Sequence, residues 1–244
     1  KNAGVIDENY CWSFGAGHLF LVGDMFDRGD NVTPCLWLIY KLEAEAEAQG
    51  GKVHYVMGNH DMMNLIGDFR YVHPKYEKHA EWMDESLISL YAADTELGRW
   101  LRSKNIIEKA GTLIFVHAGL SPDVAQLNLP LKTMNDWGRF RMNEKCETEL
   151  CQIVNGGSDQ GLYWYRGMAR QKLSQTQVDE ILQKFAAEKV IIGHTVFDEI
   201  TLLYNHRVMA IDLPHQENLQ KGFMDALYFE NGQFFRLRAG KASS

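Results

Sequence analysis

The sequence has 244 residues, of which 45% are hydrophobic and 23% are charged, so it can bury the core of one sizeable domain. It contains no apolar run of the roughly 18 residues that a transmembrane helix needs. Its formal net charge of −7 argues against non-specific nucleic-acid binding, which usually depends on a basic surface.

The four cysteines are too few for a disulfide scaffold. Cys146 and Cys151 lie five positions apart in a helix-like stretch, where they would point to different faces. We therefore expect Cys11, Cys35, Cys146 and Cys151 to be free thiols. No signal peptide is visible, but the sequence starts at Lys1 rather than Met and looks trimmed, so we expect a soluble protein of either the cytoplasm or the periplasm.

Short apolar runs that end in Gly, His or Asp predict buried strands at residues 18–23, 53–57, 112–117 and 190–193. Residues 33–49 predict a helix, with Thr33 as its N-cap, Pro34 at its first position and Gly50-Gly51 ending it. Residues 18–57 therefore predict a strand–helix–strand unit with parallel strands.

Helical patterns continue at 75–103, 132–151 and 174–188, and Ser174 is the expected N-cap of the last. The block at 75–103 lies between two strand motifs, where we expect a helical cap insertion near the mouth of the site. Near the end, residues 201–205, 207–212, 223–229 and 233–237 predict strands, the first pair and the last pair joined by hairpin turns. We see no linker or repeat, and predict a single α/β domain over residues 1–244.

Four motifs stand at the ends of four predicted strands: GDMFDRGD at 23–30, GNHD at 58–61, HAGL at 117–120 and GHT at 193–195. Ligand-binding loops gather at the carboxyl ends of the strands in α/β sheets. Any one of these residues alone would more often be a turn residue or a structural histidine. Together, Asp24, Asn59, His117 and His194 form a mixed nitrogen and oxygen ligand set that suits a borderline divalent metal such as Mn, Fe or Zn.

These motifs resemble, in order and spacing, the GDxxDRG, GNHE/D, HxG and GHx motifs of the calcineurin-like metallophosphoesterases. The resemblance spans roughly residues 18–237. The segments GDFRYV at 67–72 and WYRG at 164–167 are most similar to the Shewanella-like group of phosphoprotein phosphatases. The resemblance implies an α/β fold of the four-layer αββα sandwich type, with one sheet from the parallel unit and a second that draws on the hairpins at 201–237.

The resemblance also implies a role for each matching residue. Asp24 would bridge two divalent metal ions, and Asn59, His117 and His194 would complete the ligands of one of them. His60 would protonate the leaving oxygen and Asp27 would orient His60. Arg28 and Arg166 would bind the phosphate oxygens, because a guanidinium fork fits them bidentately.

One family motif has no counterpart in this sequence. The other metal's own ligands, an Asp-x-His on an earlier strand, are not found before Gly23, and Asp7-Glu8-Asn9 is too close to Asp24 and follows no apolar strand. We expect the first strand and its metal motif upstream of Lys1.

Asp68, Arg70 and Tyr71 follow the GNHD motif closely, and could either line the substrate entrance or be structural. Asp212 ends a predicted strand, where it is either a structural residue or a partner of a metal-bound histidine.

The expected activity is hydrolysis of a phosphomonoester by a hydroxide that bridges two metals, with a phosphorylated protein (Tyr or Ser/Thr), a peptide or a small phosphoester as substrate and no nucleic-acid partner. Two alternatives stay open. One is a phosphodiesterase or nucleotide phosphatase. The other is a degenerate phosphatase fold that acts as a binding module, which would follow if the upstream strand lacked its metal ligands.

Overall fold

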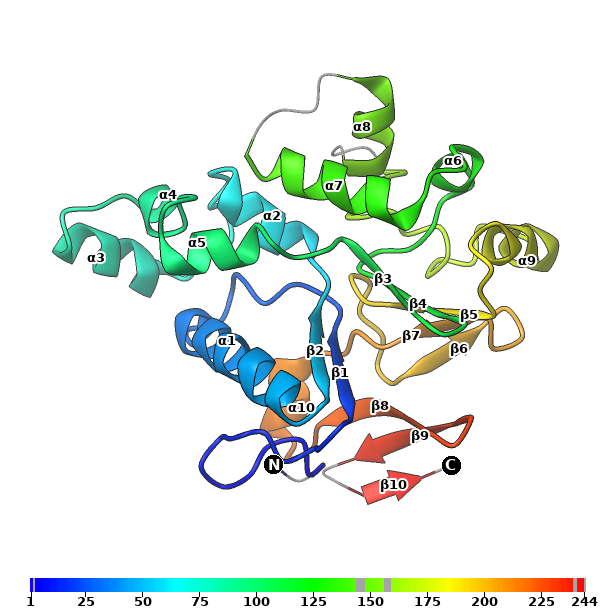
Figure 1. The fold of residues 1–244 in the computed structure, drawn as a ribbon, viewed down its shortest axis with the longest axis horizontal. Coiled ribbons are helices and arrows are strands. Elements are labelled where there is room, and N and C mark those ends of the chain that lie inside the picture. The colour runs from blue at the N-terminus through cyan, green and yellow to red at the C-terminus, as the bar shows by residue number, and fades with distance from the viewer. Residues whose placement is uncertain (2, 144–147, 156–158, 239–240, 244) are drawn as a thin grey trace.

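The computed structural model describes residues 1, 3–143, 148–155, 159–238 and 241–243 (Figure 1). The strands are β1 (His18–Leu21), β2 (Lys52–Tyr55), β3 (Ile107–Ala110), β4 (Leu113–Val116), β5 (Lys189–Ile192), β6 (Thr201–Leu203), β7 (Val208–Ala210), β8 (Asp225–Glu230), β9 (Gln233–Arg238) and β10 (Lys241–Ser243). The helices are α1 (Val32–Ala48), α2 (Asn59–Leu65), α3 (Pro74–Trp82), α4 (Leu87–Leu90), α5 (Glu96–Leu101), α6 (Pro122–Gln126), α7 (Leu131–Arg141), α8 (Glu149–Asn155), α9 (Gln175–Lys184) and α10 (His215–Gln220). No helix in these described ranges is both long enough and apolar enough to cross a bilayer.

The predicted parallel unit is confirmed: β1 and β2 pair in parallel and α1 connects them. The helix begins two residues earlier than expected, at Val32 instead of Pro34, and Asn31 rather than Thr33 is its N-cap. The backbone amide of Thr33 lies inside the first turn and donates to the hydroxyl of Tyr76 at 3.3 Å, so a residue of α3 satisfies one of the free amides at the helix start. The helix ends at Ala48, just before the two glycines.

A second sheet of five strands has the order β3-β4-β5-β7-β6. Strands β4, β5 and β7 are parallel, and β3 and β6 are antiparallel strands at its two edges. The hairpin β6–β7 therefore belongs with β4 and β5, because β7 pairs with β5, and not with the later hairpin as the sequence led us to expect. The later hairpin, β8–β9, pairs with β10 in a separate antiparallel sheet, and its two-residue turn has positive φ at Asn231 and Gly232.

Alternate residues of the central strands face two different apolar clusters. On β5, Val190 and Ile192 belong to the large cluster, which includes residues of α1, α5 and α9, whereas Ile191 belongs to a smaller one. Leu227 of β8 and Phe234 of β9 pack against the smaller cluster from the other side. The central strands thus lie between helices on one face and the β8–β9–β10 sheet on the other, and Figure 1 shows this sheet below β1 and β2.

The helical block at 75–103 consists of three short helices. Trp100 and Leu101 of α5 are buried in the main core, and α5 packs against α1. Helices α3 and α4 project at one side of the molecule (Figure 1). The assignment of this block as a cap over the site stays a prediction.

The expectation of four free thiols is wrong. Cys151, in α8, is disulfide-bonded, whereas Cys11 and Cys35 are free. Cys146 lies outside the described residues. The sequence argument assumed one continuous helix over 132–151, but α7 ends at Arg141 and α8 begins only at Glu149, so the helical geometry that argued against a disulfide does not apply.

Candidate active site

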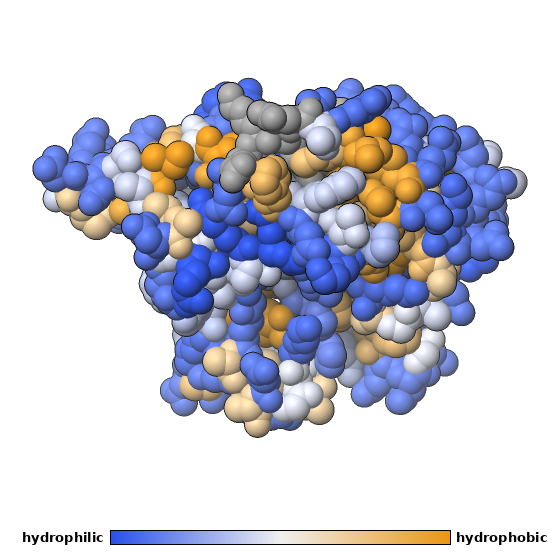
Figure 2. All heavy atoms as spheres, turned by 45° about the horizontal axis from the view of Figure 1, so that its top comes forward, coloured by the Kyte–Doolittle hydropathy of each residue, from blue (hydrophilic) through white to orange (hydrophobic). Residues whose placement is uncertain are grey.

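The four predicted motifs meet at the carboxyl ends of the central strands. Asp24 follows β1, Asn59 and His60 open α2 just after β2, His117 follows β4 and His194 follows β5. Figure 2 looks onto the face that is turned upward in Figure 1, where hydrophilic residues form a band across the middle and hydrophobic residues gather on both sides. The predicted grouping of these side chains at one edge is thus present in the structure.

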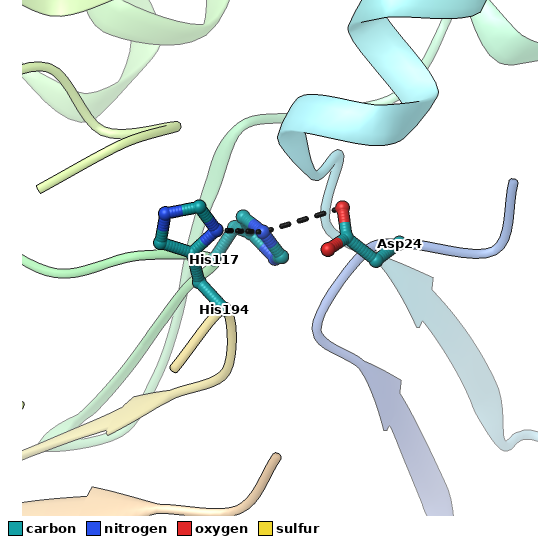
Figure 3. A group of neighbouring side chains, drawn as sticks. All are labelled: Asp24, His117 and His194. Carbon is teal, nitrogen blue, oxygen red and sulfur yellow. Dashed lines mark hydrogen bonds and ion pairs between the residues drawn. The ribbon is translucent and has the colours of Figure 1, made fainter. Parts of the chain in front are cut away.

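Three side chains of types that can ligate a metal point toward one another from three strand ends (Figure 3). One ligand atom each of Asp24, His117 and His194 lies within 4.8 Å of the other two. The Nε2 atom of His117 is 3.3 Å from Oδ1 of Asp24 and 3.2 Å from Nδ1 of His194. The Oδ1 atom of Asn59 is 3.0 Å from the same Nε2 atom, so the fourth predicted ligand joins the group.

The tautomer of His117 shows what this group can bind. Its Nδ1 atom donates to the backbone carbonyl of Val22 at 2.7 Å, and a carbonyl can only accept, so the proton of the neutral ring is at Nδ1. The Nε2 atom therefore presents a lone pair toward the oxygens of Asp24 and Asn59. A cation between them would stabilise acceptor atoms that face one another in a buried site, and the residues fit a divalent metal ion.

The electrostatics of the group agree with this. Burial, with the neighbouring His117 and Arg166, lowers the pKa of His194 to about 3, which keeps that imidazole neutral as a ligand must be. Burial opposes ionisation of Asp24, but the His117 imidazole holds the pKa of Asp24 well below its usual range. Burial likewise opposes protonation of His117, yet the carboxylate of Asp24 raises the pKa of His117. Positive charge is therefore favoured at this point of the protein.

His60 lies beside this group and is held on both ring nitrogens. Its Nδ1 atom is 2.5 Å from Oδ2 of Asp27, and its Nε2 atom accepts from Nη2 of Arg28 at 3.0 Å. The other oxygen of Asp27 accepts from Nδ2 of Asn64 at 2.8 Å. The predicted trio of His60, Asp27 and Arg28 is therefore in contact, and Asn64 is a positioning residue that the sequence did not reveal.

The loop after β1 has a strained backbone. Asp24, Asp27 and Arg28 have φ angles of 58°, 72° and 58°, in the left-handed region that most residues avoid. The glycines before and after allow a close approach of the two motif loops: a Cβ atom on Gly23 would lie 2.6 Å from Cα of Gly58. Such strain persists only where the surroundings fix the backbone.

Asp61 provides that support. Its side chain is fully buried and accepts from the backbone amides of Asp24, Met25, Phe26 and Gly58 at 2.7 to 3.2 Å. Burial, together with the nearby charge of Asp24, raises the pKa of Asp61 to about 6. One carboxylate thus ties the GDMFDRGD loop to the GNHD loop. The sequence analysis quoted Asp61 within a motif without assigning it a role; its position three residues into a helix that begins after glycine was the available signal.

Arg166 lies at the His194 side of the group. Its Nη1 atom donates to the backbone carbonyl of His194 and to the hydroxyl of Thr195, both at 2.9 Å. Burial, and then Arg170, lowers the pKa of Arg166, which still leaves it charged. The structure therefore places this predicted residue beside the group of candidate ligands, against the loop that carries one of them.

Asp7 and Asp212, two further acidic residues considered from the sequence, are not members of the group of candidate ligands. Asp7 is exposed and its carboxylate accepts from the amides of Asn9 and Cys11, as a turn residue does. Asp212 is partly buried, and burial followed by the charge of Asp24 raises its pKa. Among the described residues, the group with Asp24, His117 and His194 is the one cluster of this kind, so the ligands of a second metal other than Asp24 are not found in this part of the chain.

Comparison with known proteins agrees with this site. Residues 9–198 match the family model for calcineurin-like phosphoesterases. A Shewanella-like protein phosphatase 2 of Arabidopsis thaliana is 44% identical, over 93% of this chain and 68% of its own length. A Shewanella-like protein phosphatase 1 of Plasmodium berghei is 28% identical, over 80% of this chain and 56% of its own length. The chain thus spans little more than half of one of these curated relatives and about two thirds of the other.

Among solved structures, the cold-active protein-tyrosine phosphatase of a psychrophilic Shewanella species is similar over 100% of this chain and 73% of its own, with a TM-score of 0.92 and 33% identity. This likeness confirms the α/β fold of the calcineurin-like type that the motifs predicted. The chain belongs to the calcineurin-like phosphoesterase family, and within it to the Shewanella-like protein phosphatase group.

Proposed function

We propose that this protein is a metal-dependent phosphomonoester hydrolase that acts on phosphorylated proteins or peptides. One observation carries the proposal: a buried set of acceptor atoms around His117 Nε2 lies next to an imidazole, His60, that is held by a carboxylate and an arginine. A cation site beside a positioned proton donor and a guanidinium is the equipment that phosphate ester hydrolysis requires.

Asp24, Asn59, His117 and His194 would hold one divalent cation, and Asp24 would share a second one. The ligand set suits Mn, Fe or Zn. Bound divalent cations would make water acidic enough to attack phosphorus at neutral pH and would neutralise phosphate oxygens. We propose that the remaining ligands of the second cation lie in chain that precedes Lys1. In support, the described residues pair β1 along one edge only, with β2.

His60 would deliver a proton to the leaving oxygen. In the structure its Nε2 atom accepts from Arg28, which is exposed and can turn toward a bound phosphate. A phosphate dianion that draws Arg28 away would free Nε2 to carry a proton, and the carboxylate of Asp27 at Nδ1 would stabilise the imidazolium that results. Arg28 would then bind phosphate oxygens bidentately.

Arg166 would be the second arginine of the phosphate site. Its contacts with the backbone of His194 and with Thr195 hold it close to the candidate cation ligands. From there the guanidinium would add positive charge beside the candidate ligand His194.

Phosphotyrosine is the first substrate to test and phosphoserine or phosphothreonine the second. The similar Shewanella structure is of a protein-tyrosine phosphatase, and both named relatives above are protein phosphatases. The alternative of a nucleotide phosphatase is not favoured. The symmetrical bis(5'-nucleosyl)-tetraphosphatase of Glaesserella parasuis is 30% identical over only 62% of this chain.

The test is hydrolysis of a phosphotyrosine peptide, a phosphoserine peptide, a nucleotide and a phosphodiester, each with added Mn²⁺ and after chelation. We expect metal-dependent release of phosphate from the peptides and none from the diester. Asp24→Asn, which removes the shared ligand, should abolish both activity and metal binding. If a chain extended upstream of Lys1 bound metal tightly but hydrolysed no monoester, the result would instead favour a degenerate phosphatase fold that acts as a binding module.

A further inference from the structure

Tyr71 lies beside the proposed proton donor. The ring centroids of Tyr71 and His60 are 5.2 Å apart and the rings meet edge to face, at 64°. Tyr71 is 46% exposed, so one part of its ring contacts the histidine and another part remains open to solvent. An open aromatic surface thus stands next to the group that would protonate the leaving oxygen.

The position of Tyr71 is fixed by its backbone. Its carbonyl accepts from the amide of Arg28 at 2.9 Å. This hydrogen bond joins the segment that contains Tyr71 directly to the GDMFDRGD loop. The segment begins at Asp68, whose amide donates to the carbonyl of Met63 in α2 at 2.8 Å. Tyr71 is therefore attached to both motif loops, so its distance from His60 is set by the same elements that set the active site.

Two guanidinium groups lie near the Tyr71 ring. The Cζ atoms of Arg28 and Arg70 are each 5.7 Å from the centroid of Tyr71. Arg70 is held in place by two 2.8 Å hydrogen bonds to the carboxylate of Asp68. Cations over the face of an aromatic ring favour its ordered orientation, even at exposed sites.

The chemistry of the leaving group gives this ring a role. In an aryl phosphate the ring is bonded directly to the ester oxygen that His60 would protonate, so it must lie close to the edge of that imidazole. In a serine phosphate only a small methylene group occupies this place. An aromatic surface beside His60 therefore contacts the first leaving group and barely reaches the second.

We propose that Tyr71 is the residue that favours aryl over alkyl phosphomonoesters, by packing its exposed ring against an aromatic leaving group. This rests on the proposed function, since it takes His60 to face the leaving oxygen. Because Tyr71 would act by binding the leaving group, the preference for aryl esters should appear in KM more than in kcat.

The test compares wild type, Tyr71→Leu and Tyr71→Phe on phosphotyrosine and phosphoserine peptides of one sequence. We expect Tyr71→Leu to lower kcat/KM for phosphotyrosine about five- to tenfold, mainly through KM, with a change below about twofold for phosphoserine. Tyr71→Phe should keep the wild-type preference. Tyr10→Leu is the matched control, because Tyr10 is also about half exposed, at 52%, and contacts Lys1 rather than the site.

Equal losses on both peptides in Tyr71→Leu, or loss of the preference in Tyr71→Phe, would overturn the proposal. Calorimetric binding of non-hydrolysable phosphonate analogues of the two peptides separates this from failure of the proposed function. Suppose that wild type hydrolyses neither ester but binds the aryl phosphonate more tightly than the alkyl phosphonate, and that Tyr71→Leu abolishes this difference in affinity. The role of Tyr71 would then stand and the proposed activity would be refuted. Equal binding of both analogues by wild type would refute the role of Tyr71.

Discussion

The Nδ1 atom of His60 lies 2.5 Å from Oδ2 of Asp27, and both side chains are almost completely buried. A carboxylate can only accept, so the ring proton of neutral His60 stands at Nδ1 and the lone pair at Nε2. Asn64 donates to the second oxygen of Asp27 and to the backbone carbonyl of His60, which fixes the orientation of the pair. This arrangement prepares Nε2 for proton exchange with a group in the open part of the site.

Replacing His60 with Asn should reduce turnover of a phosphoserine peptide far more than that of a phosphotyrosine peptide. A serine alkoxide needs protonation to leave, whereas a tyrosine phenol has a pKa of about 10 and leaves more easily. We expect a loss of about 10²- to 10⁴-fold for phosphoserine, the usual contribution of a general acid. Steady-state kcat on both peptides, at matched metal content, measures this; similar losses on the two would count against His60 as the acid.

Replacing Asp27 with Asn should lower kcat for phosphoserine on the order of ten- to a hundredfold while metal binding is retained. The amide keeps the shape of the carboxylate but no longer stabilises positive charge on His60. Steady-state kcat on the phosphoserine peptide, at matched metal content, measures this. An unchanged kcat would show that Asp27 has only a structural role.

Mn²⁺ should stabilise the folded protein by an amount that rises with the logarithm of its concentration above Kd. Binding to the native state alone, at about 100 times Kd, adds about 2.7 kcal/mol to the free energy of unfolding. His117→Ala should lose most of this gain, because the Nε2 atom of His117 lies within 3.3 Å of the other three candidate ligands. Urea denaturation with and without Mn²⁺ measures it. His206→Ala is the control, because it removes an exposed imidazole that is not part of the group. If it lost as much of the Mn²⁺ stabilisation as His117→Ala, the binding would be non-specific.

The grouping of Asp24, Asn59, His117 and His194 could be predicted from the sequence because they stand in short contiguous motifs at strand ends, and parallel strands end at one edge. Their roles came from the family resemblance and stay a prediction. The rest depended on contacts between distant segments. The amide of Thr33, for example, donates to the hydroxyl of Tyr76, which lies 43 residues later in the sequence. Strand β3 was missed because Glu108 and Lys109 interrupt its apolar pattern, as an edge strand allows.

Asp61→Asn should destabilise the protein by about 2–4 kcal/mol and weaken metal binding as well. An amide nitrogen in place of one carboxylate oxygen would face backbone amides that also donate, and the strained residues Asp24 and Asp27 would lose the contacts that hold their loop. Urea denaturation and a Mn²⁺ titration measure the two effects. Asp84→Asn is the matched control, because Asp84 is exposed, and it should change neither quantity.

Asp225 should make stability depend on pH in the acidic range. Its side chain is enclosed, with contacts from Arg236 and Arg238 at 2.5 to 2.9 Å. The hydrogen bond from Arg238, opposed by burial and reinforced by Arg236, lowers the pKa of Asp225 to about 2. An unfolded aspartate has a pKa of about 3.9.

A folded-state pKa below the unfolded value means that the contribution of Asp225 to stability is fully present above about pH 4 and is lost as pH falls toward 2. Asp225→Asn should therefore be less stable than wild type by about 1–3 kcal/mol above pH 5, because a buried charge-assisted pair is broken. The difference between the two proteins should shrink as the pH is lowered from 4 to 2. Thermal unfolding across this range, with the exposed Asp198→Asn as control, measures it. If the difference in the free energy of unfolding between wild type and Asp225→Asn stayed constant down to pH 2, the charge of Asp225 would contribute nothing to stability.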